Sequence, residues 1–174
     1  MSYLLSIDGS TKATGVALFD KKDKTLIDYK EFKSNDKDMR QRIIFMIDSI
    51  KDYILKYKDI DEIVMEQVIP AINNSSTVLA LGILQGGVLG VAHSFNLNVN
   101  YITVPYWHGE LDIKKSNGDL KEQSINWVNK KFKTDFKFYS PKSTKNDDNI
   151  CDAIALGCVY MGNYNKAFGK SKRR

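Results

Sequence analysis

Short apolar runs separated by polar turns make up the start of the chain. Residues 3–7, 14–20 and 25–32 each have the composition of a strand, and only a few polar residues separate one run from the next. Neighbouring strands joined by links this short pair in opposite directions. The pattern therefore predicts an antiparallel meander of three strands.

Apolar residues then recur at helical spacing from Met39 to Tyr57. This spacing predicts an amphipathic helix that covers one face of the sheet, with residues 34–36 supplying side-chain oxygens for its N-cap. Residues 61–66 have the composition of a fourth strand. Because this strand follows a helix, we expect it to lie parallel to the first strand through a crossover connection.

Helices and strands alternate through the second half of the chain. The predicted elements are a helix over 77–92 with Ser75 and Ser76 as caps, a strand over 98–104 ended by Pro105, a short helix over 124–132, a loop over 141–146 and a helix over 147–161. This order predicts an α/β fold, with a mixed five-stranded sheet and helices on both faces.

The apolar helix over 77–92 carries a stripe of glycines. Gly82, Gly86 and Gly90 fall at positions i, i+4 and i+8, so one side of the helix lacks side chains and another backbone can approach it closely. Two interpretations are open: a helix inside the core, or a subunit interface. The run is too short, and too interrupted by Gln85, to span a bilayer comfortably.

The composition is that of an ordinary folded domain. The chain has 174 residues, of which 43% are hydrophobic and 27% charged, and this balance argues against extensive disorder. The two cysteines, Cys151 and Cys158, cannot form a disulfide scaffold. An acidic residue at position 8 comes too early for a signal peptide, so we expect a cytoplasmic protein without membrane association.

Charge is distributed unevenly along the chain. Residues 111–145 carry a net charge of +5 and residues 163–174 another +5, whereas residues 146–162 between them carry −3. Cations on both sides of a carboxylate cluster suit a polyanionic ligand, although a solvated lysine surface gives the same pattern. We expect a folded domain over 1–162 and a flexible basic tail over 163–174.

Three groups of acids occupy positions where they can converge. Asp8 and Glu66 end the first and fourth predicted strands, and parallel neighbours would bring both to one edge of the sheet. Asp148 and Asp152 are four residues apart and share one face of the last helix. For any single acid, solvation or capping is the simpler interpretation, and Asp147 has the position of an N-cap.

Converging carboxylates repel one another, and hard divalent cations relieve that repulsion. Mg²⁺ prefers carboxylate and water oxygens, and two such ions can activate a water and stabilise the leaving oxygen in phosphodiester cleavage. No other catalytic set competes, because His93 lies on the apolar helix and His108 follows Trp107, where structural roles are simpler. The acids therefore predict a metal-dependent phosphodiesterase site.

Three segments together resemble the motifs of RuvC-type Holliday junction resolvases. Residues 7–17, IDGSTKATGVA, resemble the first motif of this family. Residues 64–67, VMEQ, are similar to its second motif, a strand that ends in a glutamate. Residues 149–156, NICDAIAL, are similar to its last, a helix with the pattern Asp-x-x-Asp-Ala. The segments come in the family's order and extend over nearly the whole chain.

The resemblance implies a ribonuclease H-like fold and a homodimer that makes paired, Mg²⁺- or Mn²⁺-dependent nicks in four-way DNA junctions and other branched DNA. In each active site, which holds two ions, Asp8 would bridge the ions and Glu66 would bind one and orient the water. Asp152 with Asp148 would complete the shell. The Lys- and Asn-rich chain looks most like resolvases of phages of low-GC Gram-positive bacteria. We expect no small-molecule substrate.

The resemblance also implies roles outside the acidic cluster. The helix with Gly82, Gly86 and Gly90 matches the family's dimerisation helix. The candidates for contacting DNA phosphates are Lys114, Lys115, Lys121 and, in the tail, Lys166, Lys170, Lys172, Arg173 and Arg174. A solubilising terminus is an equally simple role for the tail.

Two positions depart from the family pattern. Asn149 stands where the family's helix carries its first acid, so either Asp148 replaces that acid, or the chain is an inactivated variant, or the site tolerates an amide. We expect Asn149 to lower activity relative to an aspartate. After Glu66, Ile69 stands in the stretch where many members carry a large aromatic. Because an aliphatic wedge unstacks bases without stacking on them, we expect a weaker sequence preference.

Two other functions are consistent with parts of the sequence. Residues 7–11 also resemble the phosphate loop of actin-like ATPases and sugar kinases, but those enzymes need a second domain for which 174 residues leave little room. A junction-binding protein with an inactive site is the other alternative, and Asn149 favours it. Asp8 and Glu66 count against it, because a protein that only binds DNA does not need converging acids.

Overall fold

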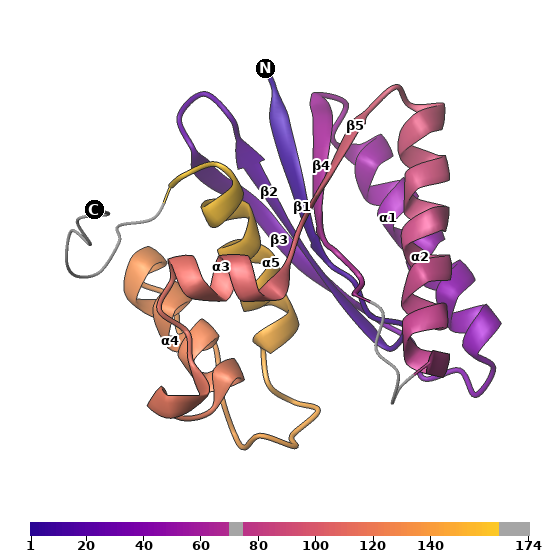
Figure 1. Ribbon diagram of the computed structural model, residues 1–174. Coiled ribbons are helices and arrows are strands. Elements are labelled where there is room, and N and C mark those ends of the chain that lie inside the picture. The colour runs from indigo at the N-terminus through magenta and orange to yellow at the C-terminus, as the bar shows by residue number, and fades with distance from the viewer. Residues whose placement is uncertain (70–74, 164–174) are drawn as a thin grey trace, which may run out of the picture.

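The computed structural model describes residues 1–69 and 75–163. Its five-stranded sheet has the order β3-β2-β1-β4-β5 (Figure 1). The strands are β1 (Tyr3–Asp8), β2 (Ala13–Asp20), β3 (Thr25–Lys33), β4 (Ile60–Glu66) and β5 (Asn98–Ile102). β1, β2 and β3 pair antiparallel, whereas β4 lies parallel to both β1 and β5. The predicted mixed sheet, with its three-strand meander and crossover, is confirmed.

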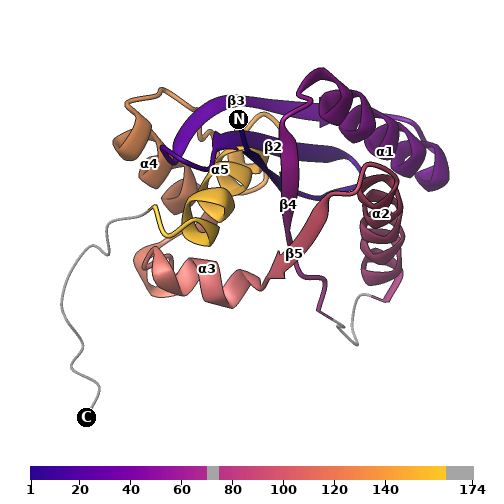
Figure 2. The same cartoon turned by 90° about the horizontal axis from the view of Figure 1, so that it is seen from above.

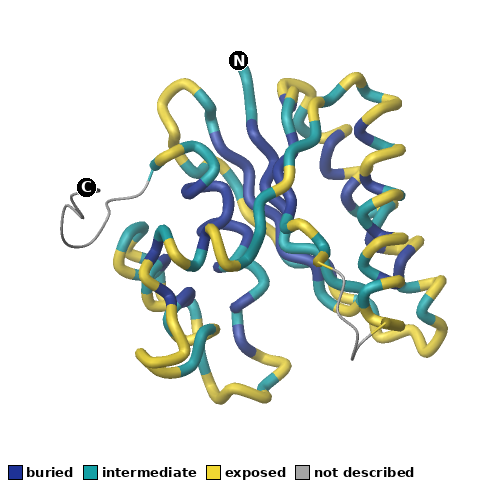
Figure 3. Tube along the Cα trace, viewed as in Figure 1, coloured by how far each residue is buried: buried dark blue, intermediate teal, exposed yellow. Residues whose placement is uncertain are grey.

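Helices cover both faces of the sheet, as predicted (Figures 1 and 2). One face carries α1 (Met39–Lys56) and α2 (Ser75–Ser94), and the other carries α3 (Val104–Glu110), α4 (Leu120–Phe132) and α5 (Asp148–Tyr160), with a short 3-10 helix, η2 (Lys115–Asn117). Each face has its own apolar core. Because successive strand residues point to opposite faces, Leu5 packs towards α1 and α2 while Leu4 packs towards α5. The central strands are accordingly buried on both sides (Figure 3).

Several predicted boundaries were wrong. α2 begins at Ser75, so Ser75 and Ser76 are its first residues and not its caps. The N-cap of α1 is Asp38, whose carboxylate accepts the Arg40 N–H at 2.8 Å, and not a residue of 34–36. The fifth strand ends at Ile102, because Pro105 occupies the first turn of α3, where its missing N–H costs no helical hydrogen bond. α4 begins at Leu120, because the Asp119 carboxylate caps it.

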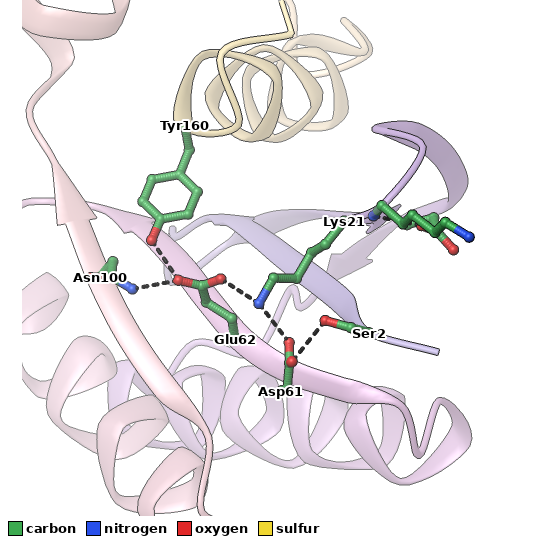
Figure 4. A network of polar contacts seen from close by, with 8 residues as sticks. Ser2, Lys21, Asp61, Glu62, Asn100 and Tyr160 are labelled. Atoms are coloured by element: carbon green, nitrogen blue, oxygen red, sulfur yellow. Dashed lines mark hydrogen bonds and ion pairs between the residues drawn. The ribbon is translucent and has the colours of Figure 1, made fainter.

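A polar network fastens α5 to the amino ends of the strands (Figure 4). The Glu62 carboxylate accepts hydrogen bonds from the Tyr160 hydroxyl at 2.5 Å and from Asn100 Nδ2 at 2.9 Å, and it pairs with Lys21 at 2.8 Å. Lys21 also pairs with Asp61. Because these links hold the last turn of α5 at the amino ends of the strands, its first turn lies towards their carboxyl ends.

The glycine stripe of α2 faces outward. An added Cβ at Gly82, Gly86 or Gly90 would meet no atom within 4 Å, so within the described part of the chain the internal-core interpretation of this stripe is wrong. The opposite side of the helix, which includes Leu84 and Val88, is buried in the core. By length and composition α2 could cross a membrane, so the prediction that this run is too short is wrong; 22% of its most apolar window is buried in this domain.

Candidate active site

Asp8 and Glu66 lie at the same edge of the sheet. β1 and β4 run parallel with Ile7 opposite Met65, and each strand ends one residue later. Asp8 and Glu66 are therefore neighbours at the carboxyl ends of adjacent strands, as the sequence predicted. Burial raises the pKa of Asp8, and repulsion from the neighbouring Glu66 carboxylate raises it further.

A glycine brings the first turn of α5 onto this edge. Gly15 is the β2 partner of Asp8, and a Cβ added to it would overlap the carbonyl group of Asn149. Any side chain at position 15 would push the start of α5 away from the sheet. The close approach places Asp148 and Asp152 within electrostatic reach of Asp8.

Burial and neighbouring charges raise the pKa values of acids in this cluster. Burial raises the pKa of Asp8 well above its usual range, and the charges of Glu66, Asp152 and Asp148 raise it further. Burial together with Glu66 and Asp148 raises the pKa of Asp152 to about 7. Burial also raises the pKa of Glu66. A bound cation stabilises the ionised form of a carboxyl group, and this effect is largest where the surroundings disfavour ionisation.

Lys121 is the cation that the chain itself supplies to this cluster. Its ammonium group lies 2.7 Å from Asp148 Oδ2, and the Asp148 side chain is only 9% exposed. The hydrogen bond to Asp148 raises the pKa of Lys121, and Lys121 in turn lowers the pKa of Asp8. The DNA-binding candidate Lys121 therefore also forms part of the acidic cluster.

Two residues that the sequence analysis did not assign to the site hold Glu66 in place. The indole Nε1–H of Trp107, a buried residue of α3, donates to Glu66 Oε1 at 2.8 Å and lowers its pKa. The side-chain amide of Gln85, on α2, donates to the backbone carbonyl of Glu66. Two features of the sequence could have pointed to these residues. Gln85 is a polar residue inside an apolar helix, and Trp107 follows shortly after the predicted fifth strand.

Asn149 is engaged with β3. Its amide Nδ2–H donates to Glu31 Oε1 at 2.8 Å, and Glu31 also pairs with Lys33 at 2.6 Å. The neighbouring Asp148, by contrast, interacts electrostatically with Asp8 and Asp152. The adjacent Asp147 caps α5 by position, while its carboxylate accepts the backbone N–H of Lys137.

The other predicted residues lie outside the acidic cluster. Lys114 pairs with Asp112 at 2.5 Å, Lys115 is exposed in η2, and Ile69 is half-exposed just after β4. His93 is exposed on α2, and the His108 ring lies against the Trp107 ring. The tail candidates lie outside the described residues: Lys166, Lys170, Lys172, Arg173 and Arg174.

The donor atoms suit a hard cation, but they do not form a closed ligand set. Asp152 is buried, and the neighbouring Ser124 hydroxyl only partly offsets the effect of that burial on its pKa. Within residues 1–69 and 75–163, however, no group of three or more His, Cys, Asp or Glu side chains is arranged to hold a metal. The oxygen donors therefore fit Mg²⁺ or Mn²⁺ in chemistry and location, and their side chains must move to coordinate it.

Comparison with solved structures identifies the fold. RuvC from Thermus thermophilus, in complex with a Holliday junction substrate, superposes with a TM-score of 0.65 over 94% of this chain and 98% of that one, at 13% sequence identity. The chain has a ribonuclease H-like fold of the RuvC type. The yeast mitochondrial Holliday junction resolvase Ydc2 is also similar, with a TM-score of 0.59 over 92% of this chain and 79% of that one, at 12% identity. No protein-family model and no curated protein sequence matches the chain.

Proposed function

We propose that the chain is a structure-selective DNA endonuclease that cuts four-way junctions and other branched DNA. The observation that carries this proposal is the convergence of Asp8, Glu66, Asp148 and Asp152, whose charges act on one another at the carboxyl ends of β1 and β4. The fold shared with RuvC, which was solved with a Holliday junction, supports DNA as the substrate. The kinship with phage resolvases of low-GC Gram-positive bacteria remains part of this proposal.

The four carboxylates would hold the divalent cations. Asp8, on which the charges of the other three acids act, would be the central ligand, and Glu66, Asp148 and Asp152 would be the others. When bound, such ions neutralise the phosphodiester and provide a nucleophilic water at neutral pH. Burial raises the pKa values of Asp8 and Asp152, so their ionised forms are unfavourable without a nearby cation.

The protein's own residues then orient the reaction. Glu66, fixed by Trp107 and through its carbonyl by Gln85, would position the attacking water in line with the departing 3′ oxygen. Lys121, whose ammonium lies 2.7 Å from Asp148 Oδ2, is the cation placed to contact the phosphate beside these acids. No covalent enzyme intermediate is required, because the proposed nucleophile is a water.

The position of Asn149 bears on which acid completes the site. Its amide is held by Glu31, while Asp148 faces the cluster, which favours the alternative in which Asp148 replaces the family's first helical acid. The prediction that Asn149→Asp cleaves faster is tested by comparing the junction cleavage rates of this variant and the unmodified chain. A new carboxylate beside Glu31 would repel it, and Lys33 is the cation placed to offset that repulsion.

We propose that the active form is a homodimer paired through α2. The open glycine stripe lies among exposed apolar residues, with Leu79 62% and Ile83 48% exposed. A two-fold dimer would present two acidic clusters to a junction that itself has near two-fold symmetry, which would allow paired nicks.

The alternative function is junction binding without cleavage. The amide at position 149, where the family's helix carries an acid, is the feature of the sequence that leaves it open. Incubation of end-labelled four-way junction and matched linear duplex, with and without Mg²⁺, separates the two. Nicks confined to the junction and dependent on Mg²⁺ support the nuclease, whereas junction binding without any cut supports the alternative.

A further inference from the structure

A cavity lies immediately beside the acidic cluster. It has a volume of about 350 Å³ and is formed by the β1–β2 loop, α1 and the start of α2. Its wall begins at Gly9, the residue that follows Asp8. Whatever occupies this cavity is therefore close to the proposed cutting site, on the α1 and α2 side of the sheet, whereas Lys121 approaches from the α4 side (Figure 2).

The lining of this cavity is suited to an anion. It contains two cations, Lys12 and Arg42, several hydroxyl groups, among them those of Ser10 and Ser76, and no carboxylate. Within the described residues, the Nε–H of Arg42 is buried without a hydrogen-bond partner. A buried cationic donor without a partner carries an electrostatic penalty, which a phosphate would remove.

The cavity wall is held in shape before any ligand binds. Arg42 Nη1 donates to the backbone carbonyls of Asp36 at 2.8 Å and Lys37 at 3.2 Å, which fixes the guanidinium while leaving Nε unused. On the opposite wall, the Thr14 hydroxyl donates to the Ser10 carbonyl at 2.6 Å and accepts the Ser10 N–H at 3.1 Å. A rigid cationic pocket binds a phosphate without first having to order its own groups.

We propose that this cavity binds a backbone phosphate of the DNA strand that is cut, close to the scissile linkage. Lys12 and Arg42 supply the charge, and the hydroxyls of Ser10 and Ser76 supply neutral donors. This inference rests on the proposed function, because it assumes that Asp8 acts on DNA. It adds a phosphate subsite across the sheet from Lys114, Lys115 and Lys121, so that the strand is held on both sides of the acids.

The test compares Lys12→Gln and Arg42→Gln with Lys22→Gln, a control at an exposed lysine on the β2–β3 turn. Affinity for a four-way junction is measured without divalent ions over a range of salt concentrations. Losing one phosphate contact should weaken binding several-fold and reduce the salt slope by about 1, while the control binds as the unmodified chain does. Unchanged melting temperature shows that Lys12→Gln is folded.

A second measurement locates the contact. Single methylphosphonate linkages, which lack the phosphate charge, are placed one at a time along the cut strand, and binding is measured with the unmodified chain and with Lys12→Gln. We expect one linkage near the cut at which the loss of affinity caused by the methylphosphonate and the loss caused by Lys12→Gln are not additive. Additive losses at every linkage, or an unchanged salt slope, would overturn the phosphate subsite even if the unmodified chain cuts junctions. If the unmodified chain neither binds nor cuts junctions, the proposed function fails, and the subsite with it.

Discussion

Gly15 and Asn149, far apart in the sequence, lie so close that a methyl group on Gly15 would overlap the Asn149 carbonyl. Gly15 is also the β2 partner of Asp8. This contact fixes the distance between the strand that carries Asp8 and the helix that carries Asp148 and Asp152. The glycine is thus what allows the last helix to deliver its acids to the sheet edge.

Gly15→Ala should therefore lower both activity and stability. The added methyl group forces α5 outward, and overpacking of this kind costs about 1–3 kcal/mol of unfolding free energy. Melting temperature and junction cleavage should fall together. Gly109→Ala is the matched control, because its Cβ meets no atom within 4 Å. Equal behaviour of the two variants would show that the close approach does not position α5.

Trp107→Phe should slow cleavage while leaving the fold intact. The substitution keeps an aromatic ring in the core but removes the N–H that holds Glu66 Oε1. Partners of this kind are worth about 10–100-fold in activity or metal affinity, so the cleavage rate should fall and the Mg²⁺ concentration for half-maximal rate should rise. Trp127→Phe, at a residue with no described link to the acids, is the control. A normal rate in Trp107→Phe would remove Trp107 from the site.

Asp148→Asn and Asn149→Ala distinguish the two candidates for the first helical acid. Because Asp148 faces Asp8 and Asn149 faces Glu31, loss of the Asp148 charge should reduce cleavage by more than about a hundredfold, beyond the effect of losing an outer partner. Asn149→Ala should have the smaller effect. Rates measured at saturating Mg²⁺ in the reverse order would assign the role to position 149.

The sequence predicted the positions of Asp8 and Glu66 because strand ends and parallel pairing follow from local patterns. It also predicted that Asp148 shares a helix face with Asp152. It could not predict that Trp107 holds Glu66, because that contact depends on how α3 packs against the sheet, and the α3 helix itself was missed at Pro105. Nor could it show that Asn149 turns towards Glu31, which is 118 residues away.

The stability of the metal-free protein should fall as the pH rises. The pKa values of Asp8 and Asp152 are raised in the folded state, so the unfolded chain loses these protons at a lower pH than the folded chain does. The free energy of unfolding attributable to them therefore declines from about pH 4, near the unfolded pKa, through about pH 7.

Melting temperatures measured in EDTA across this range test the effect. Asp152→Asn should flatten the decline and melt at a higher temperature than the unmodified chain above pH 7. Mg²⁺ should raise the melting temperature of the unmodified chain more than that of the variant. Parallel pH profiles for the two proteins would mean that the folded protein does not raise the pKa of Asp152.

Ile83→Glu should convert a dimer into a monomer. Ile83 lies on the open face of α2, and a buried charge opposite its own copy is strongly unfavourable in a two-fold interface. Sedimentation velocity should show a dimer for the unmodified chain and for Leu55→Glu, a control on the exposed side of α1. A monomeric unmodified chain would contradict pairing through α2.

Cleavage of a four-way junction tests the central claim most directly. End-labelled junction and linear duplex of the same sequence are incubated with the chain and with Asp8→Asn, with and without Mg²⁺. We predict paired nicks in the junction only, dependent on Mg²⁺ and absent with Asp8→Asn. Cuts that persist in Asp8→Asn, or a junction left whole by the unmodified chain at saturating Mg²⁺, would contradict the assignment of these acids as a nuclease site.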